Sequence, residues 1–379
     1  MGITRREFIG GAAAAGIAAK LGAAGVLVSS VASGGAAFAQ VTDYAPEVPY
    51  YDKLENRMIQ CRMCPKECRV GDAERGFCGN KENRGGKYVT LAYGHPCALN
   101  NDPIEKKPLF HFLPGTNAIS LAEAGCNFDC KFCQNWQISQ ARPEQVHGYD
   151  LMPADVVALA ARAGSPTIAY TYGEPTVFYK SMYDTAALGK EKGIRSVMIS
   201  NGYINPEPMK ALCGVLDAVK VDFKAYSEAF YSKQCLGHLK PVLDTLVLLR
   251  GRGMWFELVY LMIPTLNDDP DEIKEMAGWI MDNLGPDVPM HFSRFHPQYK
   301  LKNLQPTPLK SLERARDICM GAGMNFVYIG NVPGHAAENT YCPNCGGIAI
   351  KRYGYVIQQN NVKNGKCGSC GYVLPGVWI

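Results

Sequence analysis

The sequence predicts an α/β fold: a partial (β/α)6 barrel of the TIM type, with a cysteine-rich segment before it and a small cysteine-paired module after it. Three observations predict this fold. From Asn117 onward, β-type runs alternate with helical runs, cysteines gather on both sides of that region, and from Tyr341 the helical pattern stops. Strand–helix alternation implies parallel strands joined by right-handed crossovers. Six or seven such units favour a partial barrel over a flat doubly wound sheet, the alternative.

Composition and motifs divide the chain into four parts. We expect an export signal at residues 1–39, the cysteine-rich segment at 40–115, the barrel at 116–335 and the cysteine-paired module at 336–379. Apolar β-type runs predict strands at residues 117–121, 167–172, 195–200, 218–223, 256–262, 290–295 and 326–330. Helical patterns predict helices at residues 153–163, 176–192, 240–252, 271–283 and 309–322.

The first residues are typical of a twin-arginine export signal. Thr4-Arg5-Arg6-Glu7-Phe8-Ile9 precedes a stretch rich in Ala, Gly and Val, and Ala37-Phe38-Ala39 supplies a signal-peptidase pattern. This leader predicts export to the periplasm or cell surface after cytoplasmic folding, and it leaves a cytoplasmic function open. A membrane anchor is the alternative. No later segment is long and apolar enough to span a bilayer, so we expect no permanent membrane span.

Bulk properties exclude some classes of partner. The 379 residues carry a net charge of +4, which is too weak to indicate a nucleic-acid binder, so we expect none. Most of the 15 cysteines lie in short runs or pairs. In a chain of this size, such clustering favours metal or iron–sulfur ligation over a disulfide framework.

A three-cysteine loop follows the first barrel strand, with the pattern Cys126-x-x-x-Cys130-x-Phe132-Cys133. Three thiolates at these spacings can hold three corners of a 4Fe–4S cubane and leave the fourth iron without a protein ligand. A structural zinc site requires four protein ligands, so zinc completed by a distant cysteine is the alternative.

This pattern resembles the signature of the radical S-adenosylmethionine (SAM) superfamily, with Phe132 at its aromatic position. The resemblance implies a radical SAM barrel in which SAM chelates the open iron. It also implies that an electron from a low-potential donor splits SAM into methionine and a 5′-deoxyadenosyl radical, which removes a hydrogen atom from a substrate.

Motifs at the ends of later strands resemble further parts of the same superfamily. Gly173-Glu174 is similar to the motif that binds the SAM amino group, and Ser200-Asn201 to a segment near its ribose and carboxylate. Asp222, Lys224 and His296 resemble catalytic positions of pyruvate formate-lyase activating enzyme. Each alone is also compatible with a turn, a surface ion pair or a core histidine, but barrel enzymes build their sites at strand ends.

A wider pattern is more specific. It comprises four segments: Cys61-x-x-Cys64-Pro65 with Cys68 and Arg75-Gly-Phe-Cys78-Gly79, Asp102-Pro-Ile-Glu-Lys-Lys-Pro-Leu-Phe-His111, Cys133-Gln-Asn-Trp136 and Gly330-Asn-Val-Pro-Gly334. Together these resemble the radical SAM enzyme of the AmmeMemoRadiSam system, a relative of the pyruvate formate-lyase activating enzymes. That resemblance implies a Memo-like or AMMECR-like partner protein. Glu123 stands where a small residue is expected, which loosens the match locally.

Two further cysteine groups predict metal sites. Cys342, Cys345, Cys367 and Cys370 form two glycine-bearing pairs separated by 21 residues, the arrangement of a zinc ribbon, with rubredoxin-like iron as the alternative. For Cys61, Cys64, Cys68 and Cys78, the alternatives are zinc, a second cluster or disulfides, and the tight spacing favours a metal. The isolated cysteines are expected to be small buried apolar residues: Cys97, Cys213, Cys235 and Cys319.

Three classes of function follow from these motifs. The favoured hypothesis is a radical SAM enzyme that abstracts hydrogen from an unidentified substrate. Its narrower version is an activase that installs a glycyl radical on a partner protein. The rival of another class is an exported iron–sulfur or zinc electron-transfer protein without radical catalysis, and a zinc-ribbon regulator is the weakest option.

Overall fold

The computed structural model describes residues 44–378. The export signal expected at residues 1–39 lies outside the described residues. Within residues 44–378, no helix is both long enough and apolar enough to cross a membrane.

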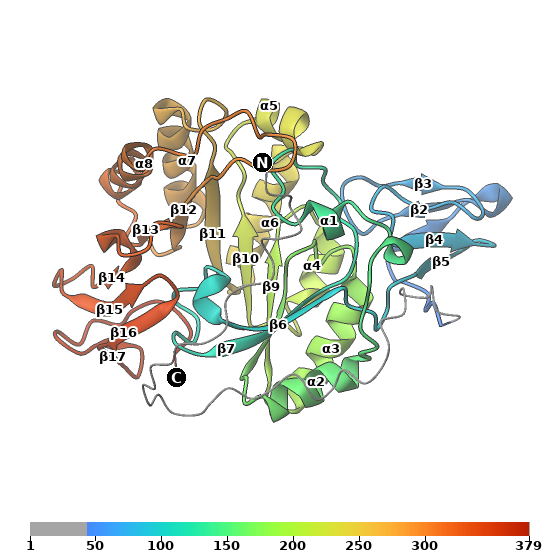
Figure 1. The fold of residues 1–379 in the computed structure, drawn as a ribbon, viewed down its shortest axis with the longest axis horizontal. Coiled ribbons are helices and arrows are strands. Elements are labelled where there is room, and N and C mark those ends of the chain that lie inside the picture. The colour runs from blue at the N-terminus through green and yellow to red at the C-terminus, as the bar shows by residue number, and fades with distance from the viewer. Residues whose placement is uncertain (1–43, 379) are drawn as a thin grey trace, which may run out of the picture. The chain divides into compact units, whose positions relative to one another are not determined.

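One sheet of eight strands forms the centre of the described chain (Figure 1). Its strands lie side by side in their sequence order, and all neighbours are parallel except β6, which pairs antiparallel with β7 at one edge. A doubly wound sheet reverses its strand order, so the observed order excludes that alternative. The strands are β6 (Ala98–Pro103), β7 (Asn117–Ala122), β8 (Thr167–Tyr170), β9 (Arg195–Ser200), β10 (Ala218–Asp222), β11 (Trp255–Met262), β12 (Met290–Arg294) and β13 (Val327–Gly330).

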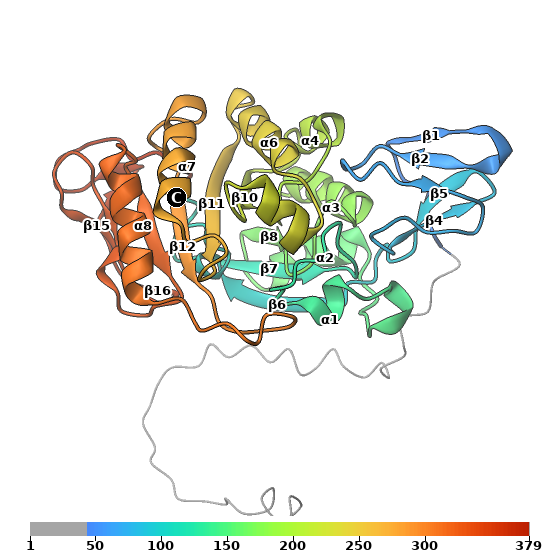
Figure 2. The ribbon, with the colours of Figure 1, turned by 90° about the horizontal axis from the view of Figure 1, so that it is seen from above.

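Helices connect the parallel strands. Figure 2 shows the sheet bent, with α3, α4, α6 and α7 along its outer side. The connecting helices are α2 (Pro153–Arg162), α3 (Tyr179–Glu191), α4 (Pro206–Leu212), α6 (Leu239–Gly251), α7 (Pro270–Asn283) and α8 (Leu309–Gly321). The shorter helical segments are η2 (Glu55–Arg57), η3 (Ile104–Lys106), α1 (Trp136–Ser139), η4 (Pro143–Gln145), α5 (Glu228–Phe230), the π-helical turn η5 (Tyr231–Cys235) and η6 (Ala336–Glu338).

Helix α7 illustrates how the sequence forms these elements. The Asp269 side chain accepts hydrogen bonds from the first backbone N–H groups of the helix, and Pro270 occupies the first helical position. Its buried positions recur at helical spacing, so a single apolar face packs into the core: Ile273, Met276, Ala277 and Ile280. The same logic makes the strands, whose buried residues are largely β-branched or aromatic.

The predicted strands lie within two residues of the observed ones, and four of the five predicted helices lie within one residue. The exception is the helix expected from residue 176, because α3 begins at Tyr179. The Thr176 amide and hydroxyl both donate to the carboxylate of Glu174, so the segment after Pro175 forms a turn instead.

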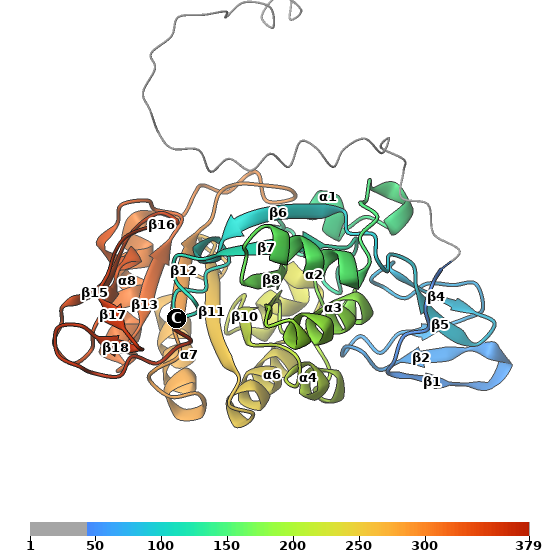
Figure 3. The same cartoon turned by 90° about the horizontal axis from the view of Figure 1, so that it is seen from below.

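The N-terminal segment contains two small antiparallel sheets (Figure 3). Its strands are β1 (Tyr51–Lys53), β2 (Ile59–Cys61), β3 (Arg69–Val70), β4 (Lys81–Arg84) and β5 (Lys87–Thr90). Ile59, Met63, Val70 and Tyr88 are buried in the same apolar core as the barrel-type strands, so this segment packs directly on the central unit. Residues 98–103, which we assigned to the cysteine-rich segment without predicting a strand there, form β6 and join the central sheet.

The C-terminal module is built from short strands: β14 (Thr340–Tyr341), β15 (Ile348–Tyr353), β16 (Val356–Asn360), β17 (Val362–Lys363) and β18 (Lys366–Cys367). A small apolar cluster joins its Cys342, Ala349 and Leu374 to Phe110 and Tyr328 of the central unit. Arg352 is buried beside this cluster, where its guanidinium lies 4.1 Å from the Phe110 ring centroid. The module is therefore packed against the barrel-type sheet as part of the same body.

Candidate functional site

The loop after β7 carries Cys126, Cys130 and Cys133 and has no regular structure between residues 123 and 135. Its backbone is fixed by distant segments. The amides of Asp129 and Lys131 each donate over 3.0 Å to carbonyls of η5, and the Asn127 side chain donates over 2.7 Å to the carbonyl of Tyr203. These bonds hold the three cysteines at the carboxyl ends of the parallel strands, as the motif predicts.

The spread of the three sulfur atoms fits a cluster better than a single ion. A tetrahedral zinc ion holds its sulfur ligands about 3.8 Å apart, given a Zn–S bond of about 2.3 Å. A cubane binds each thiolate at a separate iron and so holds them farther apart. Within residues 44–378, the three sulfur atoms of this loop do not all lie within 4.8 Å of one another, a wider spread than that around one zinc ion.

The thiols of the loop differ in their surroundings. Burial raises the pKa values of Cys126 and Cys133, and Ser139 Oγ lies 3.2 Å from Cys133 Sγ. The thiol of Cys235 donates to Cys130, and this contact, together with the Lys224 ammonium, lowers the pKa of Cys130 despite burial. Cys235, which we expected to be an apolar core residue, is indeed buried but also contacts Cys130 of the cysteine loop. No local sequence pattern indicates this contact.

Three of the predicted SAM-binding residues lie in direct hydrogen-bond contact. Glu174 Oε1 accepts from Ser200 Oγ over 2.8 Å, and Glu174 Oε2 accepts from the Asn201 amide over 2.8 Å. The carboxylate is buried, and burial raises the pKa of Glu174 against the opposing effect of these donors. The structure therefore places a buried carboxylate, with its orientation fixed, beside the cysteine loop.

Gly173 has a packing role that the motif did not reveal. A Cβ added there would lie 3.1 Å from the Glu123 carbonyl oxygen and 3.4 Å from that of Gly125. The missing side chain therefore lets the end of β8 approach the cysteine loop closely.

Asp222 and Lys224 form an ion pair of 3.0 Å at the end of β10. A second lysine, Lys220, also contacts Asp222, and it points to the same face because it lies two residues away in the strand. Burial opposes ionisation, yet the two ammonium groups lower the pKa of Asp222 to about 2. The Lys224 ammonium lies 5.9 Å from the centroid of the buried Phe132 ring, which joins this pair to the cysteine loop.

His296 follows β12 and is exposed, and it makes no hydrogen bond with the part of the chain that the structure describes. The structure does not bring it into contact with Glu174, Asp222 or the cysteines. The buried histidines are His111 and His291. His291 Nε2 lies 2.8 Å from Glu257, in a polar network that faces the C-terminal module.

A buried ion pair at the end of β6 and in the segment after it was not assigned from the sequence. Lys107 Nζ lies 2.6 Å from Asp102 and 4.6 Å from the Tyr172 ring centroid, and the Tyr172 hydroxyl donates to Asp102. Burial lowers the pKa of Lys107 to about 8, although Asp102 opposes the shift. Because Tyr172 directly precedes Gly173, this pair ties β6 to the segment that carries Glu174.

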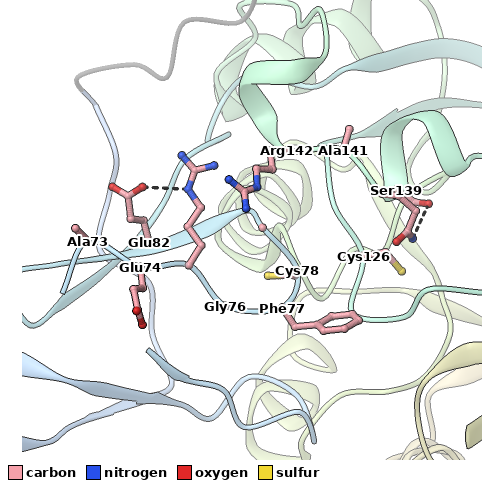
Figure 4. A pocket seen from close by; sticks show the side chains of 13 residues that line it. Ala73, Glu74, Gly76, Phe77, Cys78, Glu82, Cys126, Ser139, Ala141 and Arg142 are labelled. Carbon is pink, nitrogen blue, oxygen red and sulfur yellow. Dashed lines mark hydrogen bonds and ion pairs between the residues drawn. The ribbon is translucent and has the colours of Figure 1, made fainter. Parts of the chain in front are cut away.

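A cavity of about 560 Å³ lies between the N-terminal segment and the cysteine loop. Figure 4 shows the side chains that line it. Cys78 lines it on one side, and Cys126 lines it on the other. Arg75 crosses one wall, where it pairs with Glu82 at 3.0 Å and with Glu144 at 2.8 Å. The cavity is therefore polar, and it reaches one member of each of two cysteine groups.

The C-terminal cysteines converge as predicted. All four ligand atoms of Cys342, Cys345, Cys367 and Cys370 lie within 4.8 Å of one another, with Sγ–Sγ distances of 3.6 Å for Cys342–Cys370 and 3.9 Å for Cys345–Cys367. These distances match the edge of a tetrahedron around one metal ion. The residues fit zinc or iron, which share this sulfur geometry.

Glu123 is a buried acid beside the cysteine loop, and its Oε2 atom has no hydrogen-bond partner among the described residues. Burial raises the pKa of this carboxyl from 4.5 to about 8, although Ser181, Lys81 and Asn80 oppose the shift. Because the folded-state pKa is raised, the folded protein is destabilised when Glu123 must ionise. This destabilisation is absent below pH 4.5, grows as the pH rises and is complete above about pH 8.

We therefore expect Glu123→Gln to remove this destabilisation. The variant should equal the wild type within about 1 kcal/mol at pH 5 and exceed it by on the order of 3 kcal/mol at pH 9. Denaturant unfolding at the two pH values measures the difference. Glu191→Gln, at an exposed position of α3, is the control and should leave the pH dependence unchanged. An equal pH dependence of Glu123→Gln and wild type would contradict the assignment.

Comparisons with known proteins agree with this site. Residues 124–280 match the model of the radical SAM superfamily. Over 327 residues the chain is 46% identical to the uncharacterized protein MJ0808 of Methanocaldococcus jannaschii, which covers 86% of this chain and 97% of that protein. It is 25% identical over 289 residues to MJ0674 of the same organism, covering 72% of this chain and 78% of that protein.

Solved structures show a weaker likeness. A radical SAM methyltransferase from Sphaerobacter thermophilus is 17% identical with a TM-score of 0.47, covering 60% of this chain and 71% of that chain. A domain of a pyruvate-formate lyase-activating enzyme from Bacteroides vulgatus is 15% identical with a TM-score of 0.39, covering 43% of this chain and 98% of that chain. Both likenesses are too distant to indicate an activity.

The cysteine loop and the family match together define the class of protein. The chain belongs to the same family as MJ0808, and its residues 124–280 match the radical SAM domain. That domain implies a 4Fe–4S cluster and SAM as cofactors, and the buried Glu174 and the three cysteines are the residues that fit them.

Proposed function

We propose that this protein is a radical SAM enzyme that cleaves SAM reductively and abstracts a hydrogen atom from a substrate. The observation that carries the proposal is the contact of Glu174 with Ser200 and Asn201 beside a three-cysteine loop whose sulfur atoms are spread more widely than around one zinc ion. A 4Fe–4S cluster on Cys126, Cys130 and Cys133 would supply one electron and one open iron for SAM.

The residues around the loop have distinct roles in this proposal. Glu174 accepts the amino group of SAM, because it is a buried carboxylate whose shape is fixed by four donors. Asn201 and Ser200 position the carboxylate and ribose, and Lys224 with Asp222 offers a fixed cation and anion on the same side. Phe132 shields the cluster from water. The bent, sequentially ordered sheet supports the description as a partial (β/α)6 radical SAM barrel.

Several finer points belong to the same proposal. The electron donor is a low-potential protein, the C-terminal cysteines hold zinc as a ribbon, and the twin-arginine leader directs export. The motifs shared with the AmmeMemoRadiSam radical SAM enzymes support a Memo-like or AMMECR-like protein as partner. The substrate is not defined by any of these residues.

The test is formation of 5′-deoxyadenosine. Anaerobically reconstituted protein with dithionite and SAM should yield 5′-deoxyadenosine and methionine in equal amounts. Changing Cys126, Cys130 and Cys133 to alanine should abolish the product, whereas Cys213→Ala, at a half-buried cysteine outside the site, should retain it. Absence of product from wild-type protein that carries a full cluster would contradict the proposal and favour an electron-transfer protein.

The activase version has a specific test. If the substrate is a glycine residue of a partner protein, incubation with that partner, SAM and reductant should give a glycyl radical signal by electron paramagnetic resonance. Formation of 5′-deoxyadenosine without such a signal, in the presence of a Memo-like and an AMMECR-like protein, would exclude this version and leave the broader one intact.

A further inference from the structure

Four cysteines of the N-terminal segment meet at one small cavity. Cys61 ends β2, Cys64 and Cys68 follow it in a turn, and Cys78 comes from the loop between β3 and β4. All four line a cavity of about 20 Å³ together with Tyr88 and Lys81. They are free thiols, so the disulfide alternative is not the arrangement of this structure.

The spread of these four sulfur atoms differs from that of the C-terminal group. Within residues 44–378, only the C-terminal cysteines place three or more ligand atoms within 4.8 Å of one another. The N-terminal four, like the loop cysteines 126, 130 and 133, do not place three sulfur atoms within 4.8 Å of one another. Because one zinc ion holds its thiolates about 3.8 Å apart, this spread favours a polynuclear cluster over zinc.

Buried positive charge at the site calls for an anionic occupant. Lys81 is 3% exposed and donates over 2.6 Å to the carbonyl of Val177, and it forms no ion pair within the described residues. The buried carboxyl of Glu123 interacts with this ammonium but forms no ion pair with it, so the charge of Lys81 is only partly compensated. Lys81 lines the cavity with the four cysteines, and thiolates of a bound cluster would supply negative charge beside it.

The N-terminal group adjoins the proposed catalytic cluster site. The Cys78 carbonyl oxygen would lie 2.4 Å from a Cβ added at Gly125, the residue directly before Cys126. Lys66 lines the small cavity together with the four cysteines. The cavity of Figure 4 reaches Cys78 and Cys126 together.

From this geometry we infer that Cys61, Cys64, Cys68 and Cys78 bind a second 4Fe–4S cluster, which relays electrons to the cluster on Cys126, Cys130 and Cys133. Four cysteines ligate all four irons, so this cluster has no open iron for SAM. One electron passes from a reduced low-potential protein of the ferredoxin class to the N-terminal cluster, so the donor is oxidised and the cluster is reduced by one electron. The N-terminal cluster returns to its oxidised state when it passes this electron to the loop cluster.

Metal analysis tests the site without relying on activity. Anaerobically purified wild-type chain should contain about eight iron and eight sulfide per chain, and the variant with Cys126, Cys130 and Cys133 changed to alanine should keep about four of each. Reduced with dithionite, this triple variant should give a cluster signal by electron paramagnetic resonance that SAM does not alter. Iron-free triple variant, with or without additional zinc, would overturn the inference.

A variant of the N-terminal group separates this inference from the proposed function. The relay role rests on the proposed function, whereas the second metal site does not. Cys64→Ser/Cys68→Ser should keep about four iron per chain and a signal that SAM alters. A SAM-insensitive wild type that nevertheless carries eight iron would refute the proposed function alone. Retained zinc in the C-terminal group and an unchanged circular dichroism spectrum report that the variant is folded. A folded variant that still holds eight iron would overturn the second site.

The relay is tested by the source of electrons. We expect Cys64→Ser/Cys68→Ser to lower the rate of 5′-deoxyadenosine formation at least tenfold more with a reduced ferredoxin than with dithionite, which is small enough to reach the loop cluster directly. Equal rate losses with the two donors, or no loss with either, would overturn the relay while leaving the metal site to the iron analysis.

Discussion

Replacing Glu174 by glutamine should weaken SAM binding by roughly 30- to 1,000-fold, the largest effect that we expect from one isosteric change in the site. Truncating the charge of one partner in a buried, hydrogen-bonded charge pair costs about 2–4 kcal/mol. Glu174 is 2% exposed, so solvent screens its charge little. Glutamine keeps the shape of the side chain but cannot offer an anion to an amino group.

The same substitution also disturbs the hydrogen bonds that fix the carboxylate. Both carboxylate oxygens of Glu174 act as hydrogen-bond acceptors, and their donors are Thr176, Ser200 and the Asn201 amide. A glutamine Nε2 would face one of these donors without an acceptor, which leaves buried polar groups unpaired. Part of the lost affinity will therefore come from displacement of Ser200 and Asn201.

Equilibrium binding of SAM to the reconstituted protein measures this effect, and iron content shows that the cluster is retained. Thr176→Val is the matched control: it removes one donor to Glu174 Oε1 and keeps the charge, so it should weaken binding less than tenfold. If Glu174→Gln bound SAM within threefold of wild type, the assignment of Glu174 to the SAM amino group would be wrong.

The central strands and most helices were predictable because their signals are local. Strand β9, for example, is a run of apolar and small residues between a charged helix end and an Asn-Gly turn, and its predicted bounds are the observed ones. Strand β6 gave no such signal, because its sequence Ala-Leu-Asn-Asn-Asp-Pro is polar. It is an edge strand that gains its place from pairing with β7.

Residues of the candidate site were predictable where they belong to a motif of the resembled family. They were not predictable where their role comes from contacts between segments far apart in the sequence. The cysteine triad and Glu174 come from motifs of short spacing. Lys220, by contrast, is a single charged residue in an apolar strand, and no motif marks it. Only the structure shows that Lys220 and Lys224 both pair with Asp222. The contact of Cys235 with Cys130 joins residues more than 100 positions apart and has no local pattern.

Loss of the C-terminal metal site is the change that should most reduce stability. We expect Cys342→Ser/Cys370→Ser to lower the free energy of unfolding of the chain by about 5 kcal/mol or more. Structural zinc contributes about 10–16 kcal/mol to the folding of small metal-bound modules. Here part of that free energy is offset by apolar packing, since Cys342 and Cys367 share a buried cluster with Phe110, Phe326 and Leu374.

The effect should extend beyond the module because buried polar contacts join it to the central sheet. Arg352 of β15 is 3% exposed and donates over 2.8 Å to the carbonyl of Phe110, whose amide donates to Glu257 of β11. Unfolding of the module would expose this arginine, leave the Phe110 carbonyl without its donor and take the Arg352 charge away from the buried Glu257. Buried charges that lose their partners destabilise a protein strongly.

Denaturant unfolding with and without a strong chelator measures the contribution. The chelator should destabilise the wild type and leave the double variant unaffected, while Cys213→Ser, outside every cysteine group, should behave as the wild type does. Metal content by mass spectrometry identifies the ion and should fall by one equivalent in the variant. Equal stability of variant and wild type at full metal loss would mean that apolar packing alone holds the module on β13. The four converging sulfur atoms would then have no structural role.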